Sequence, residues 1–142
     1  MKQVLYTLAF LLSGHIIHAQ DIALFNKDGK AIAYIATDDE EMPVFLYNGK
    51  PVAYITKDNV YGYNGKHLGW YDKGVIRTHE GKIIATTKDA SSQYTQYEPY
   101  KNYKQSKPYK SYQHTAPYKV YAQSGWTAEG FEAFLLKGQK ER

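Results

Sequence analysis

The side chains of this chain that are best suited to chemistry are its histidines and one run of carboxylates. His67, His79 and His114 lack the spacing that metal ligands have within one strand or helix. A pairing of histidines across different hairpins is the alternative to isolated side chains. The acidic run at 38–41 is interpreted as a solvated loop, with weak cation binding as its alternative. Neither feature predicts a resident metal or cofactor.

The patterns of nucleophilic and phosphate chemistry are missing from the sequence. The 142 residues contain no cysteine, and no Ser-His-Asp or phosphate-loop motif is present. The glycines follow turn-forming residues and are therefore interpreted as turn glycines. The sequence predicts a protein that is not an enzyme, has no catalytic residues and uses no cofactor.

The first residues have the pattern of a secretory signal peptide over 1–19. Lys2 is the positive start, an apolar run extends from Val4 to Leu12, and Ala19 is the small residue expected before a cleavage point. The run is too short for a membrane anchor, and an N-terminal core helix is the alternative interpretation. We therefore expect a periplasmic or secreted protein without a transmembrane anchor after cleavage.

An internal repeat is the strongest signal in the sequence. It aligns four glycines, each followed by a lysine and, four residues after the glycine, by a small residue. The glycines are Gly29, Gly49, Gly65 and Gly81, and the small residues are Ala33, Ala53, Gly69 and Ala85. The last two glycine spacings are 16 residues, and the first is 20 because the acidic run is inserted there.

Each repeat is predicted to form one β-hairpin of a domain over 21–90. Asp28-Gly29 and its counterparts have the composition of two-residue type I′ turns, and their flanks are rich in β-branched and aromatic residues. Such a turn would place Phe45 opposite Val52. Because both hairpin faces are apolar, we expect a closed all-β ring, a shallow barrel of four hairpins with pseudo-fourfold symmetry and small residues near its axis.

One face of the predicted hairpins carries most of the large aromatic side chains. The candidate binding residues on it are Phe25, Tyr34, Phe45, Tyr54, Tyr61 and Trp70. The alternation also places Val52 and Leu68 on this face. If the face is open, it forms a concave aromatic site for an envelope glycan, peptide, lipid or protein. The alternative is that the rings fill the core, and the exposure of Trp70 decides between the two.

Two segments carry a resemblance to a known family. They are the hairpin sequence YNGKHLGWY at 63–71 and the tail motif Trp126-Thr127 followed by Phe131 and Phe134. Over residues 22–88 the repeat resembles the bacterial 4-fold beta flower domain. The resemblance implies a shallow symmetric β-barrel and brings no established activity, so no catalytic residue is carried over. The insertion after the first repeat and the polar fourth repeat depart from the regular pattern.

A tyrosine-rich tract occupies residues 91–125. Its tyrosines recur at multiples of three residues, and Pro99, Pro108 and Pro117 each begin a Pro-Tyr-Lys-x-Tyr unit. A period of three matches polyproline II, which would align the tyrosines on one edge with lysines beside them. A disordered, solvated linker is the alternative. The basic aromatic composition would suit single-stranded nucleic acid, but export disfavours that partner.

The C-terminal segment 126–138 is predicted to form a short amphipathic helix that Thr127 caps. Its expected anchors are Trp126, Phe131, Phe134 and Leu135. Such a helix is too short to be stable alone, and each large apolar side chain left in water would forfeit about 1.5–3 kcal/mol. We therefore expect the tail to dock on the β-domain and to hold the tyrosine edge against the barrel wall.

Two functions are compatible with these patterns. The first is an exported, non-catalytic binding or interaction module of the bacterial envelope, whose ligand the sequence does not identify. The second is a structural or adhesive assembly protein that acts through the Tyr/Lys tract on a polymer or an anionic surface. In the first the repeats bind the ligand, whereas in the second the tract does so.

Overall fold

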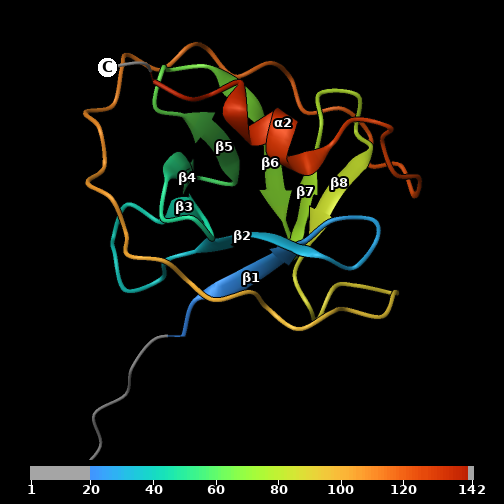
Figure 1. The fold of residues 1–142 in the computed structure, drawn as a ribbon. Helices are drawn as coiled ribbons and strands as arrows, with labels where there is room; N and C mark the ends of the chain where they lie inside the picture. Colours follow the sequence, from blue (N-terminus) through green and yellow to red (C-terminus); the bar gives the residue numbers. More distant parts are fainter. Residues whose placement is uncertain (1–19, 141–142) are drawn as a thin grey trace, which may run out of the picture.

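The four hairpins pair with one another in a closed ring, because both of their faces are apolar and must be buried. In the computed structural model, which describes residues 20–140, eight short antiparallel strands pair in sequence order, and β1 pairs with β8 to complete a barrel (Figure 1). The strands are β1 (Ile22–Phe25), β2 (Ala31–Ile35), β3 (Pro43–Leu46), β4 (Pro51–Thr56), β5 (Asn59–Gly62), β6 (His67–Asp72), β7 (Val75–Arg77) and β8 (Ile83–Thr86). The predicted all-β ring is confirmed, and the predicted signal peptide at 1–19 lies outside the described residues.

The hairpin turns are not the predicted two-residue type I′ turns. In the second repeat the N–H of Gly49 donates to the carbonyl of Leu46 at 2.9 Å, and of the two turn residues Asn48 and Gly49 only the glycine has a positive φ, +94°. This geometry is a type I turn followed by a glycine bulge. The side chain of Asn48 accepts a 3.0 Å bond from the N–H of Lys50, which stabilises the turn without left-handed backbone at the asparagine.

The bulge changes the register beyond each turn. Phe45 pairs with Pro51, so the predicted pairing of Phe45 with Val52 is wrong. Val52 and Leu68 also leave the aromatic face and join the interior cluster, because the extra residue of a bulge shifts the alternation. The type I′ geometry instead occurs between hairpins, at 57–58 and 73–74, where both turn residues have positive φ.

The barrel interior is filled by aliphatic and small side chains. Ala33, Ala53 and Ala85 are fully buried, as expected for residues that crowd near the barrel axis. At the equivalent position of the third repeat, a Cβ on Gly69 would overlap the backbone carbonyl oxygen of Arg77 in the neighbouring strand and would lie 3.2 Å from the ring of Phe134 in the tail. Glycine is therefore needed there for the close approach of the strands, and it also leaves room for the tail.

The tail helix α2 (Phe131–Leu136) docks on the barrel, as predicted. Its buried side chains belong to the same cluster as the barrel interior; they are Phe131, Phe134 and Leu135. The helix begins later than predicted, with Gly130 as its N-cap. The reason is that Trp126 forms a parallel bridge with Ile83, so residues around it extend the sheet edge instead of starting the helix.

The tyrosine-rich tract runs around the barrel between β8 and α2 without helix or strand (Figure 1). We call residues 91–125 the belt. Within residues 20–140, no helix is both long enough and apolar enough to cross a lipid bilayer.

Candidate functional site

The predicted aromatic face exists, but it is closed to solvent. Its six candidate residues, Phe25, Tyr34, Phe45, Tyr54, Tyr61 and Trp70, are each at most 5% exposed. Trp70, whose exposure was to decide the matter, is 4% exposed. Five of these rings are core residues, as the alternative interpretation expected, but they form two clusters of their own that are separate from the barrel interior: Phe25, Tyr34 and Phe45 in one, and Tyr54 and Tyr61 in the other. They lie on the outer wall and the belt covers them.

The belt is attached to the barrel at four equivalent points, one at each hairpin turn. At each point a belt N–H donates to the carbonyl oxygen of the turn glycine: Gln96 to Gly29 (2.8 Å), Gln105 to Gly49 (2.8 Å), His114 to Gly65 (2.8 Å) and Gln123 to Gly81 (3.0 Å). The donors are nine residues apart in the belt, whereas the acceptors follow the hairpin repeat. The belt therefore has a repeat of its own that matches the fourfold barrel.

The turn glycines meet two requirements at once. Gly49 has a φ of +94°, a conformation that side chains with a Cβ disfavour. The carbonyl oxygen of Tyr103 in the belt also occupies the place where a Cβ at this position would stand. The same crowding recurs at the other three turns, so glycine is needed there both for the turn and for the approach of the belt.

The lysines of the belt face the barrel. The ammonium group of Lys101 lies 4.8 Å from the centre of the Tyr34 ring, and that of Lys110 lies 4.2 Å from the Tyr54 ring. Such placement is favourable because the face of an aromatic ring carries negative potential. The same lysines pair with barrel carboxylates: Lys101 with Asp21 (3.3 Å), Lys110 with Glu41 (2.7 Å) and, further along, Lys119 with Asp72 (3.2 Å).

The acidic run at 38–41 anchors the belt through two of its members. Lys107 pairs with both Asp39 and Glu41, and Lys110 also pairs with Glu41. Hydrogen bonds from Lys110 and then Lys107 hold the pKa of Glu41 below its usual range, and the bond from Lys107 does the same for the pKa of Asp39. The run is thus part of an ion-pair network rather than a purely solvated loop.

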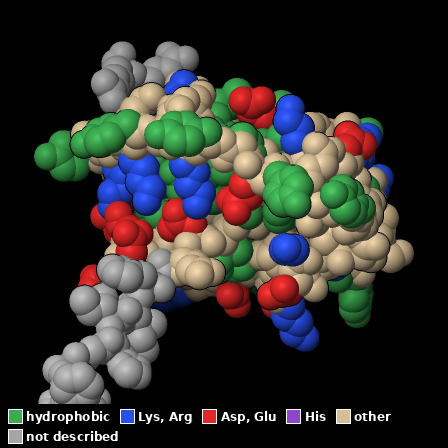
Figure 2. Space-filling view, turned by 60° about the horizontal axis from the view of Figure 1, so that its bottom comes forward, with side chains coloured by type: hydrophobic (Ala, Val, Ile, Leu, Met, Phe, Trp, Pro, Cys, Tyr) green, Lys and Arg blue, Asp and Glu red, His purple; other side chains and the backbone are tan. Residues whose placement is uncertain are grey.

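The tyrosines of the belt face the solvent. All eight side chains are 81–98% exposed; they are Tyr94, Tyr97, Tyr100, Tyr103, Tyr109, Tyr112, Tyr118 and Tyr121. Figure 2 shows such rings projecting in a row, with lysines and then carboxylates beneath them. The expectation that the tyrosine edge lies against the barrel wall is wrong, because the lysine side of the belt takes that place.

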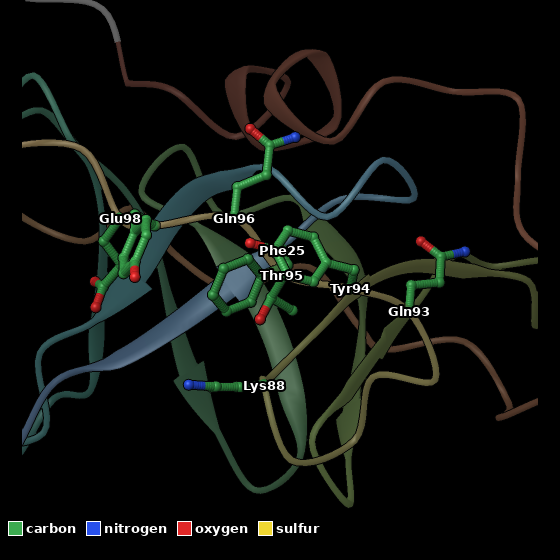
Figure 3. A pocket seen from close by; sticks show the side chains of 8 residues that line it. Phe25, Lys88, Gln93, Tyr94, Thr95, Gln96 and Glu98 are labelled. Carbon is green, nitrogen blue, oxygen red and sulfur yellow. The ribbon is translucent and has the colours of Figure 1, made fainter.

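A hollow of about 520 Å³ lies where the belt begins, beside the edge at which β1 meets β8 (Figure 3). It is lined by Phe25, Lys88, Gln93, Tyr94, Thr95, Gln96, Tyr97 and Glu98. Glu98 already accepts a hydrogen bond of 2.8 Å from the hydroxyl of Tyr47. The hollow therefore combines aromatic walls with amide, hydroxyl, ammonium and carboxylate groups on a short stretch of surface.

The structure brings two of the three histidines together, which was the alternative to isolated side chains. Nδ1 of His67 lies 2.9 Å from Nε2 of His79, and Nε2 of His67 donates to the side-chain oxygen of Asn59 at 2.9 Å. Burial, with His79 as a lesser cause, lowers the pKa of His67 to about 4, and burial also lowers the pKa of His79. Among residues 20–140 no group of three potential metal ligands occurs, so the pair is described as a hydrogen-bonded contact.

A comparison with protein families agrees with this architecture. A family model described as 4-fold beta flower protein matches residues 22–135. The chain belongs to this family. The match continues beyond the hairpins through the belt and into α2, so this beta flower includes the belt and the tail helix as well as the barrel. Searches among curated proteins and solved structures found no match.

Sequence reasoning missed the attachment of the belt to the beta flower barrel. The signal for it was present as a Tyr-x-Gln or Tyr-x-His unit that recurs every nine residues, from Tyr94 to Gln123. Its four occurrences equal the number of hairpin turns. The prolines of the same period were recognised, but the match between the two repeats was not.

Proposed function

We propose that this beta flower is an exported, non-catalytic binding module of the bacterial envelope, and that its ligand is a glycan bound along the belt tyrosines. Export follows from the signal-peptide pattern at 1–19, and the location would be the periplasm or the cell exterior. The observation that carries the proposal is the 81–98% exposure of the eight belt tyrosines.

Exposed aromatic rings in this number suggest a contact surface. Isolated apolar residues are ordinary on protein surfaces, but contiguous patches are associated with interaction sites. The belt rings are held outward because the lysine side of the same segment is bound to the barrel, at Lys101 and Lys110 for example. The outward orientation of the tyrosine rings is therefore fixed by the contacts of the belt with the barrel.

The chemistry of this surface suits a glycan better than a nucleic acid or an anionic membrane. A tyrosine offers a flat apolar ring and a hydroxyl group, which match the apolar face and the hydroxyl rim of a sugar ring. The belt cations lie beneath the rings and pair with carboxylates such as Asp21 and Glu41, so little positive charge is offered outward. Repeated weak contacts along a polymer would add up through avidity.

The test uses four tyrosines whose carbonyls do not contact the turn glycines: Tyr97, Tyr100, Tyr109 and Tyr118. We expect their joint substitution by serine to reduce retention of the full-length protein on insoluble envelope polysaccharide by at least about tenfold. Joint substitution by phenylalanine is the matched control and should retain most of the binding, because it keeps the rings. Equal retention of the serine variant and the original protein would contradict the proposal.

The second function, a structural or adhesive protein that acts through the Tyr/Lys tract, uses the same belt in a different way. Adhesion to anionic surfaces needs lysines that face outward, whereas Lys110 and Lys119 are engaged with barrel carboxylates. Deletion of the tract would not separate the two functions, since it would also uncover the buried aromatic wall. Point variants of the tyrosines are the cleaner experiment.

A further inference from the structure

The fourfold barrel has one seam that differs from the others. At each seam between neighbouring hairpins one cross-strand pair lies on the outer wall: Tyr34 with Phe45, Tyr54 with Tyr61, Trp70 with Arg77, and Thr86 with Phe25. The first member of each pair is aromatic at three seams and is a threonine at the seam between β8 and β1. This seam therefore lacks one large ring. The Trp70–Arg77 seam also has a single ring, but there the long side chain of Arg77 takes the second place and donates to the carbonyl oxygens of Gly81 and Gln123.

The belt also covers this seam with shorter side chains. Lys101 and Lys104 extend over the Tyr34–Phe45 seam. The belt repeat of nine residues assigns Ser92 and Thr95 to the corresponding places at the β8–β1 seam. Because the belt begins at the β8–β1 seam, no preceding belt unit supplies a side chain as long as Lys101 or Lys104 there. The hollow of about 520 Å³ lies at this seam, where Thr86 on the barrel and Ser92 and Thr95 on the belt are all small.

A buried hydroxyl group lies beside the hollow without a partner. Thr86 is 3% exposed, and its Oγ1 has no hydrogen-bond partner among residues 20–140. It is the direct cross-strand partner of Phe25, which lines the hollow, so the two side chains share the outer face of the sheet. Thr86 is not among the residues that line the hollow, so it contributes to this seam by its small size and not as a hydrogen-bonding group for a ligand.

We propose that this hollow binds one acidic sugar residue, of the uronic-acid type, of the glycan that the tyrosines hold; the inference rests on the proposed function. Lys88 would pair with the carboxylate, while the amide of Gln93 and the hydroxyl group of Thr95 would bond to sugar hydroxyls. The carboxylate of Glu98 also lines the hollow, but it accepts a hydrogen bond from Tyr47 and pairs with Lys101. The rings of Tyr94 and Tyr97 would contact the sugar face. Figure 3 shows the side chains of Lys88, Thr95 and Tyr94 grouped around the Phe25 ring.

The test measures binding of glucuronate and of glucose to the full-length protein by NMR titration. We expect glucuronate to shift the side-chain amide signals of Gln93 and Gln96, and glucose to bind at least about tenfold more weakly, since it lacks the charged contact. Lys88→Gln should remove this preference, whereas Lys66→Gln, a substitution of an exposed lysine at a distant hairpin turn, should preserve it. Equal binding of the two sugars, or no shift with either, would overturn the proposal.

Two substitutions of Thr86 separate binding from folding. Thr86→Val keeps the size of the side chain and should leave both glucuronate binding and the melting temperature unchanged, because no bond of the free protein is lost. Thr86→Tyr adds a large ring at this seam and should abolish binding by filling the hollow. If the folded tyrosine variant binds glucuronate as tightly as the original protein, the assignment of the hollow is wrong.

The two proposals fail in different ways. If the four-serine belt variant loses polysaccharide retention but Lys88→Gln leaves the sugar preference unchanged, the tyrosine surface stands and the hollow is not its acidic-sugar site. If glucuronate binds in the hollow but the belt variant is still retained on polysaccharide, the belt is not the glycan surface.

Discussion

The backbone N–H of Gln105 donates to the carbonyl oxygen of Gly49 across 2.8 Å, and this contact joins two repeats of different length. The hairpins repeat with a spacing of 16 or 20 residues, and the belt repeats with a spacing of nine. The two agree because an extended chain outside a small barrel needs only a few residues to pass from one hairpin turn to the next. The contact thus explains why the belt units and the turns are equal in number.

Substitution of a turn glycine should detach the belt locally. Gly49→Ala places a Cβ in left-handed backbone and against the carbonyl of Tyr103, and we expect a loss of at least about 2 kcal/mol in the free energy of unfolding. Denaturant titration measures it, and limited proteolysis should show faster cleavage near residue 103. Gly125→Ala is the control, because nothing lies within 4 Å of the added Cβ. Equal stability of the two variants would contradict the role of the belt contact.

Truncation of Phe134, a tail side chain buried in the interior cluster, should destabilise the whole barrel. Phe134 is fully buried in the interior cluster, so Phe134→Ala should cost about 3–5 kcal/mol. Leu136→Ala on the same helix should cost less than about 1 kcal/mol, because that side chain is 38% exposed. Thermal unfolding followed by circular dichroism measures both. A small effect of Phe134→Ala would show that the barrel is stable without this side chain.

The histidine pair should make the protein less stable in acid. Burial lowers the pKa of His67 to about 4, below the value of about 6.5 expected for the unfolded chain. The unfolded state therefore binds more protons between these values, and stability should fall by up to roughly 3 kcal/mol as the pH drops from 6.5 to 4. Denaturation series at several pH values test this slope. His67→Phe should flatten it, and His114→Gln, which introduces the residue found at the other belt contacts, should not.

The ion pairs of the acidic run should hold the middle of the belt only weakly. Lys107→Met with Lys110→Met removes the pairs to Asp39 and Glu41, and we expect a loss of less than about 1 kcal/mol per pair because the groups are partly exposed. High salt should produce a similar loosening in the original protein and little further change in the variant. Proteolysis rates between 104 and 112 measure it. A salt response that is identical in both proteins would exclude these pairs as the cause.

Sequence alone was sufficient for the features that depend on local patterns. The turn glycines, the β-branched flanks and the two apolar hairpin faces predicted a closed ring of four hairpins, and the apolar face of Phe131, Phe134 and Leu135 predicted a docked tail. These predictions succeed because turn chemistry and the need to bury apolar surface are properties of short segments.

The remaining features were decided by geometry that a residue pattern does not specify. Within a hairpin, the bond to the Asn48 side chain accompanies the type I turn, and the bulge that follows this turn places Val52 inward. The contact between His67 and His79 depends on the packing of two neighbouring hairpins, whereas the outward position of the tyrosines and the hollow at the β8–β1 seam depend on where the belt crosses the barrel. A periodic sequence determines which residues share an edge of an extended segment. Only the carboxylates, rings and glycine carbonyls of the folded barrel determine which edge is bound and which faces the solvent.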